Sequence, residues 1–235
     1  PPKWQDLAKD TIFKRFAELI KLLGREQGVF VNQVEWGKEL LWCSVWLPTD
    51  LGHFASVKVA GASYLTSLGA VIAKNTLVGQ IQFNESLIPM NRTDQPTVRI
   101  HYFTHGHEGS TAFWAKSEGI RCIAKVCDFL AALPKPLGFW SANKEVAPLL
   151  LHRLPDTMIK PKAAGINAMR DEASCAMIFS SKALPSDLPL RVIFGLTDED
   201  FLAAREDEDI FQFATRGAIR NPDYGGDYDV YVYSR

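Results

Sequence analysis

Residues 227–235, DYDVYVYSR, show the plainest alternation of side chains in the sequence. Successive side chains of a β-strand point to opposite faces of its sheet, so a period of two predicts a strand at this end of the sequence. The tyrosines and valines of the stretch are residue types enriched in strands.

Shorter stretches of the same kind occur along the chain, separated by turn residues. We expect strands within 28–36, 36–48, 76–90, 173–181, 188–196 and 210–217. Two more are expected in 96–116, on either side of a tight turn. About eight short strands without regular strand–helix alternation favour an antiparallel sandwich or barrel over a doubly wound parallel sheet.

Few segments have a helical pattern. Residues 4–23 repeat apolar side chains at three- and four-residue steps, and a short helix is expected within 62–73. Residues 118–132 fit a helical stripe and a strand alternation equally well, and the sequence leaves the two open. Residues 197–209 are expected to form an acidic loop that carries a helix-capping signal.

The domain prediction follows from these segments. We expect a mainly β fold with a helical N-terminal arm over residues 1–24 and a few short helices in loops. No Gly/Ser/Pro-rich linker divides the remainder, so residues 25–235 are expected to form a single β-sandwich domain.

Composition excludes some classes of function. The formal net charge of −1 over 235 residues disfavours a folded surface that grips nucleic acid broadly, and leaves a local patch as the remaining route. The four cysteines include no Cys-x-x-Cys pair and are expected to be buried free thiols. No apolar run is long enough to span a bilayer and no signal peptide is evident, so we expect no membrane partner.

The stretch that begins at His101, HYFTHGHEGST, is the strongest candidate for chemistry. His101, His105 and His107, with Glu108 as an orienting group or general base, would form the zinc site of a metal-dependent hydrolase. The glycine turn inside the stretch breaks the strand register, and no fourth ligand follows. A solvated hairpin tip is therefore the favoured interpretation, and we expect no metal, no cofactor and no catalytic residue.

Other catalytic and binding motifs are missing from the sequence. It contains no nucleophile elbow and neither of the two glycine-rich phosphate loops, Gly-x-x-x-x-Gly-Lys-Ser/Thr and Gly-x-Gly-x-x-Gly. Trp36, Trp42 and Trp46 share one parity and would face one side of a hairpin. Core packing is the simpler interpretation of these tryptophans, and a subunit interface is the more specific one.

Three stretches together resemble the coat proteins of picorna-like positive-strand RNA viruses. The first is DLAKDTIFKRFAELIKLLG leading into FVNQVEW, which is similar to the passage from an N-terminal arm into the first strand. The second is the strand, Leu-Pro and small-residue helix that precede GQIQF at 79–83. The third is LPLRVIFGLTDEDF followed by DIFQFATRG, which is similar to the late strand, acidic loop and Phe-x-Phe-x-x-Arg-Gly ending of that family.

The resemblance implies a fold and a function. The fold would be an eight-stranded antiparallel jelly roll. The protein would be a non-enzymatic capsid subunit, cut from a polyprotein, which assembles with like or different subunits into an icosahedral shell. Its partners would be these subunits and, on the inner face, genomic RNA; it would occur in the virion and, during assembly, in the host cytoplasm. The alternatives are the metal-dependent hydrolase and a cytoplasmic adaptor that binds a protein through the aromatic face.

Overall fold

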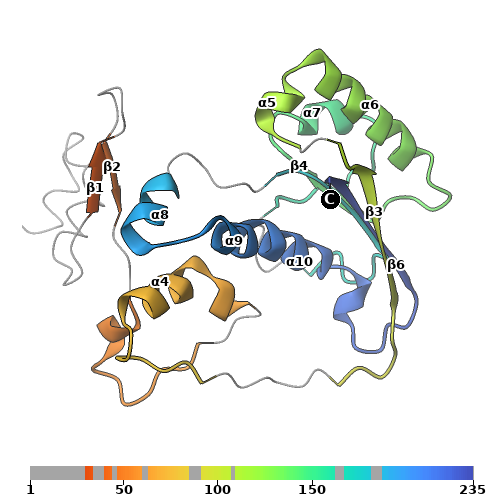
Figure 1. Cartoon of the computed structure of the whole chain (residues 1–235). Helices are drawn as coiled ribbons and strands as arrows, with labels where there is room; N and C mark the ends of the chain where they lie inside the picture. Colours follow the sequence, from red (N-terminus) through yellow and green to blue (C-terminus); the bar gives the residue numbers. More distant parts are fainter. Residues whose placement is uncertain are drawn as a thin grey trace, which may run out of the picture. The chain divides into compact units, whose positions relative to one another are not determined.

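The computed structural model describes residues 30–33, 40–43, 47–59, 63–84, 91–106, 109–161, 167–180 and 187–234 (Figure 1). The chain divides into two compact units: residues 1–82 with 183–201, and residues 83–182 with 202–235. The predicted arm over 1–24, with its helix at 4–23, lies outside the described residues. The predicted domain boundaries therefore stay predictions.

The first unit contains an antiparallel ladder and short helices. β1 (Phe30–Gln33) pairs with β2 (Leu40–Cys43), which confirms the two strands predicted for this part of the chain. The 3-10 helices η1 (Pro48–Leu51) and η2 (Tyr64–Thr66) precede α4 (Leu68–Thr76), which overlaps the helix predicted at 62–73. α8 (Leu188–Phe194) and α9 (Asp198–Phe201) contact α4. Asn75 at the end of α4 donates from Nδ2 to the carbonyl oxygen of Phe194, at 3.1 Å.

α8 occupies a segment for which a strand was predicted. Its Val-Ile-Phe run favours a strand locally. Pro189 lies in the first turn, where its fixed φ suits a helix, and Gly195 ends the helix with φ at 63° in the left-handed region. Phe194 and Leu196 are buried, so the helix end is also held by packing. The strand prediction was wrong because these helix-end signals and the packing outweigh local β-propensity.

The second unit is built on a four-stranded sheet in which all strands are parallel. β3 (Thr97–Thr104), β4 (Phe139–Ala142), β5 (Ser174–Ile178) and β6 (Asp227–Ser234) lie in the order β3-β6-β5-β4. In the register, Val230 of β6 lies between Ile100 of β3 and Cys175 of β5. The last strand in the sequence is thus a central strand of the sheet.

Helices cover both faces of this sheet (Figure 1). On one face, α6 (Ser117–Ala131) and α7 (Ala147–Leu150) form a core with the sheet residues Trp140, Ala142, Ala176, Ile178, Tyr231 and Tyr233. On the other face, Phe213 of α10 (Glu208–Ala214) forms a second core with the sheet residues Phe139, Cys175, Met177, Tyr228, Val230 and Val232. The second unit therefore has a three-layer α/β arrangement.

The prediction of an antiparallel eight-stranded jelly-roll sandwich is therefore wrong. The strand predicted at 227–235 is confirmed over Asp227–Ser234, but its neighbours run parallel to it. Alternation is typical of a sheet with one wet face, whereas Tyr228 and Tyr231, on opposite faces of β6, are 0% and 6% exposed. A tyrosine has an apolar body, so a strand buried on both faces still shows a mixed pattern.

Other segments differ from the prediction or decide an alternative that the sequence left open. Residues 118–132, for which helix and strand were both open, lie in α6 up to Ala131, and the buried Ile123, Val126, Cys127 and Leu130 form one helical stripe. The predicted hairpin at 96–116 is a strand, β3, followed by the helix α5 (Thr111–Trp114), so its second strand was wrong. The strand predicted at 210–217 is largely α10, and no strand is described in residues 76–84.

The acidic segment was wrongly predicted to be a loop. It begins α9, continues as a π-helical stretch η4 (Leu202–Asp207) and enters α10. The capping signal is confirmed: the amide of Asp200 donates to Thr197 Oγ1 at 3.1 Å, and the amide of Thr197 donates to Asp200 Oδ2 at 2.8 Å.

Candidate functional site

The histidine stretch does not bring its described members together. His101 points to the α6 face of β3, where its ring stacks on Tyr231 with centroids 4.6 Å apart. His105 follows the end of β3, and its ring lies 6.0 Å from that of Tyr102, which has the opposite parity to His101. Residues 107 and 108 lie outside the described residues. Within the described part of the chain, no group of three His, Cys, Asp or Glu side chains could hold a metal ion.

The tryptophan prediction is not tested. Trp42 lies in β2, but its side chain, like residues 36 and 46, is outside what the structure describes. The interface role of Trp36, Trp42 and Trp46 stays a prediction.

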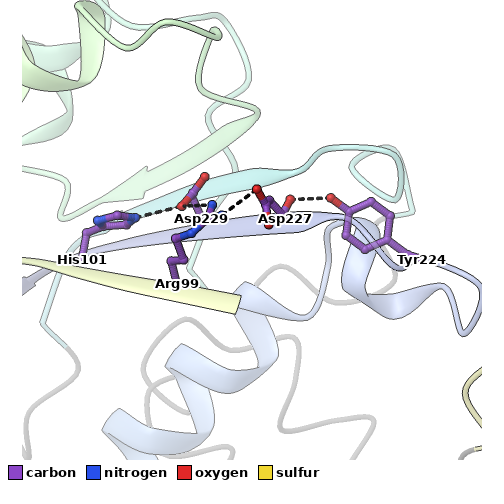
Figure 2. A network of polar contacts seen from close by, with 5 residues as sticks. All are labelled: Arg99, His101, Tyr224, Asp227 and Asp229. Carbon is purple, nitrogen blue, oxygen red and sulfur yellow. Dashed lines mark hydrogen bonds and ion pairs between the residues drawn. The ribbon is translucent and has the colours of Figure 1, made fainter. Parts of the chain in front are cut away.

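A polar network joins the first halves of β3 and β6 on the α6 face (Figure 2). Arg99 Nη2 lies 2.6 Å from Asp227 Oδ2, and Arg99 Nη1 lies 3.6 Å from Asp229 Oδ1. His101 Nε2 lies 2.9 Å from the same Asp229 oxygen. Tyr224 donates its hydroxyl to the carbonyl oxygen of Asp227.

The strand register explains this network. Arg99 lies directly opposite Asp229 and diagonally from Asp227, which are the two positions that a long side chain reaches across a ladder. Arg99 and His101 both contact carboxylates, and the side chains are 46% and 41% exposed. An exposed, charge-paired group of this kind links two strands and contributes little to stability, because solvent screens the charges. The network is complete without a ligand.

Arg216 differs from the exposed, ion-paired Arg99 in its burial and in its contacts. It follows α10, is only 9% exposed, and its Nε atom has no hydrogen-bond partner among the residues that the structure describes. In the residues that the structure describes, no carboxylate forms an ion pair with it, whereas Arg99, Arg153 and Arg191 each contact an aspartate. Burial lowers the pKa of Arg216 from its ordinary value, and the positive charge of Arg220 lowers the pKa further. An arginine nevertheless remains protonated at neutral pH.

The turn that carries Arg216 is fixed by its neighbours. The Tyr228 hydroxyl on β6 donates to the carbonyl oxygen of Ala214 at 2.7 Å, and the amide of Ala218 donates to the carbonyl oxygen of Glu172 at 2.8 Å. Between these two contacts, Gly217 passes so close to β6 that a Cβ atom would collide with the Tyr228 ring. The backbone on either side of Arg216 is therefore held against β6 and Glu172.

Arg220 adds a second cation four residues later. It ends the 3-10 helix η5 (Ala218–Arg220) and donates from Nη1 to Asn167 Oδ1 at 2.7 Å. Asn167 is a neutral partner, so the charge of Arg220 is not compensated there. The turn that carries the two arginines contacts Glu172, just before β5, and Tyr228, near the start of β6. Both arginines therefore belong to a turn at the amino ends of these two strands.

This pair of arginines was not predicted as a site from the sequence. Arg216 and Gly217 were part of the Phe-x-Phe-x-x-Arg-Gly resemblance, but no role was assigned to them. An arginine followed by glycine after an amphipathic segment is a weak signal, because its burial depends on contacts with β6 and with Glu172.

Comparison of the chain with protein-family models, with curated proteins and with solved structures found no match. Among the helices in the described part of the chain, none combines the length and the apolar character that crossing a membrane requires. The candidate site therefore rests on the geometry of Arg216 and Arg220 alone.

Proposed function

We propose that the second unit binds a phosphate-bearing ligand through Arg216 and Arg220. The observation that carries this proposal is Arg216, a residue only 9% exposed whose Nε atom is buried without a hydrogen-bond partner among the described residues. A buried charge is costly unless a counter-charge accompanies it, and the described residues form no ion pair with Arg216. A bound anion would supply the missing charge and accept the free N–H.

Phosphate is the anion that fits this pair best. Guanidinium groups bind phosphate oxygens through two parallel N–H donors, and such charge-assisted bonds are about twice as strong as neutral ones. The second cation, Arg220, has only a neutral amide partner, so a ligand with two negative charges would be matched by two positive ones. The three-layer α/β arrangement is one that often carries phosphate ligands, which is a fold-level analogy.

The proposed site differs from the usual phosphate site of parallel sheets. Such sites use a glycine-rich loop at the carboxyl end of a strand, and the sequence contains neither loop motif. Side-chain cations at the start of β6 would do the binding instead. A local pair of arginines is also compatible with the formal net charge of −1, which argues only against a broadly basic surface.

Isothermal titration of the full chain tests the proposal. Pyrophosphate is titrated first, followed by a nucleoside triphosphate and a short single-stranded oligonucleotide. Arg216→Met removes the buried charge and keeps much of the side-chain length, and we expect it to weaken binding at least about 30-fold. Arg170→Met is the matched control, because Arg170 is 66% exposed and its Nε lies 4.0 Å from Asp171 Oδ1, at the limit of an ion pair.

The two sources of phosphate give different results. A nucleotide site would show tight triphosphate binding and a weak response to salt, whereas a polynucleotide site would show affinity that falls steeply as salt rises. Equal affinity of the unaltered chain and the Arg216→Met variant for every probe, or no binding by the unaltered chain, would contradict the proposal.

The capsid role stays a prediction that no comparison bears on. It was tied to an antiparallel jelly roll, and the described residues have a parallel sheet, so the fold no longer supports it. The non-enzymatic character, the capsid and RNA partners and the virion location remain predictions in the same sense. The same applies to the adaptor and to the metal-dependent hydrolase, whose described residues His101 and His105 contact different rings, those of Tyr231 and Tyr102.

A further inference from the structure

Arg92 makes an unusual set of contacts just before β3. Its Nη1 atom donates to the carbonyl oxygen of Ile219 at 2.8 Å, and its Nη2 atom donates to those of Asn221 and Tyr224 at 3.1 and 3.3 Å. Its Nε atom donates to the carbonyl oxygen of Asp94 at 3.3 Å. All three nitrogens of the guanidinium are thus used, and every acceptor is a backbone carbonyl.

Three of these carbonyls belong to the segment that contains Arg220. Within that segment, 217–224, the backbone forms short-range turns, such as the bonds from the amide of Arg220 to Gly217 and from that of Tyr224 to Asn221. The amide of Ala218 and Nη1 of Arg220 also bond Glu172 and Asn167 outside the segment. A short 3-10 turn is easily deformed without outside support. The rigid planar fork of an arginine fixes several carbonyls at once, which a flexible lysine cannot do in the same way.

Neighbours of Arg92 hold the same segment from the same side. The amides of Thr93 and Asp94 donate to the carbonyl oxygen of Pro222 at 3.2 and 3.4 Å. The Thr93 hydroxyl donates to Asp223 Oδ1 at 2.7 Å. These contacts bind the loop beyond residue 221, whereas Arg92 also reaches the carbonyl of Ile219, which adjoins Arg220.

We infer that Arg92 is a positioning residue of the proposed phosphate site, which holds η5 so that Arg220 faces the same ligand as Arg216. This inference rests on the proposed function. Arg92 itself does not contact the ligand, because its donors are occupied by carbonyls. It links the segment that enters β3 to the segment that enters β6, and so couples the site to the edge of the sheet.

A double-mutant cycle on the full chain tests this role, with pyrophosphate as the probe in the titration. Arg92→Met is expected to weaken binding by about 5- to 30-fold, because Arg220 is released from its position. In a chain that already carries Arg220→Met, the same change is expected to cost less than about twofold, because Arg92 acts through Arg220. Arg92→Lys, which keeps the charge without the fork, should restore only part of the affinity.

Hydrogen exchange of the same variants without ligand measures directly whether Arg92 holds segment 217–224. We expect Arg92→Met to speed the exchange of amides in 217–224 by at least about tenfold, with β5 unchanged. Unchanged exchange there would overturn the inference.

The outcomes separate the two proposals. If Arg220→Met weakens binding and Arg92→Met does not, the positioning role is wrong and the phosphate site stands. If Arg92→Met costs the same with and without Arg220, its effect is general destabilisation and the inference is also overturned. If the unaltered chain does not bind pyrophosphate, nucleotide or oligonucleotide, the proposed function and the inference both fail.

Discussion

Replacing Arg216 by methionine should stabilise the ligand-free protein, which is an unusual expectation for a buried residue. In the absence of ligand, the Nε–H group of Arg216 is buried without a partner. Leaving a buried donor unsatisfied costs about 1–3 kcal/mol, and more when the group is charged. Methionine is flexible and apolar and fills irregular space, so Arg216→Met removes this cost without opening a large cavity.

The expected magnitude follows from that cost. We expect the free energy of unfolding to rise by about 1–3 kcal/mol, and the melting temperature by roughly 3–15 °C for a unit of this size. The assay is thermal and urea unfolding of the full chain, with Arg170→Met as a surface control that should stay within about 0.5 kcal/mol.

Ligand should then offset much of this stability difference. Pyrophosphate at about one hundred times its dissociation constant adds about 2.7 kcal/mol to the unaltered protein and about 0.9 kcal/mol to a variant that binds about 30-fold more weakly. If the ligand-free Arg216→Met variant is less stable than the ligand-free unaltered chain, the reasoning is refuted. Arg216 would then stabilise the fold even without a bound anion.

Other consequences of the structure can be checked separately. Burial raises the pKa of Cys175 to about 12 from 9.0, so its thiol should resist iodoacetamide in the native protein at pH 8.5 and react once urea unfolds the chain. Because the folded pKa is the higher one, the stabilisation from this thiol is complete below pH 9 and is lost as pH rises towards 12, which urea midpoints across that range would show. Gly217→Ala should destabilise the chain by about 2 kcal/mol or more, because its Cβ would meet the Tyr228 ring, and an unchanged urea midpoint would contradict this close approach. Thr197→Ala should cost about 1 kcal/mol because the two bonds between Thr197 Oγ1 and Asp200 are lost, and thermal unfolding that matches the unaltered chain would argue against it.

The sequence predicted several strands correctly but could not predict how they pair. Residues 227–234 alternate as a strand must, yet alternation does not distinguish a parallel neighbour from an antiparallel one. Helices α6 and α10 cover the two faces of the sheet, and the packing of α6 on β6 joins segments that are far apart in the sequence. Tyr231 contributes to the ambiguity, because a tyrosine satisfies both a polar and a buried position.

Helix ends were a better guide than propensity in the segments that were predicted wrongly. In α8, Pro189 and Gly195 mark the start and the stop of a helix, although the residues between them favour a strand. The Thr197 and Asp200 signal marked a true helix start, and the acidic residues after it were taken for a solvated loop because charge is common to loops and helix surfaces.

The candidate site could not have been predicted, because it is defined by two arginines that lack a carboxylate partner in the described residues. The sequence shows Arg216 and Arg220 but not that one is buried and that neither contacts a carboxylate in the described residues. That property depends on where α10 ends, on the close approach at Gly217 and on the turn that Arg92 holds.

The most direct measurement is the nitrogen NMR signal of the Arg216 Nε–H group during a titration with pyrophosphate, assigned by its loss in Arg216→Met. We expect a saturable shift of this signal, whose titration curve gives the same dissociation constant as calorimetry. We also expect the Nε proton to exchange more slowly with water. An unchanged chemical shift, whether pyrophosphate binds elsewhere or does not bind at all, would contradict the claim that the Arg216 guanidinium binds phosphate.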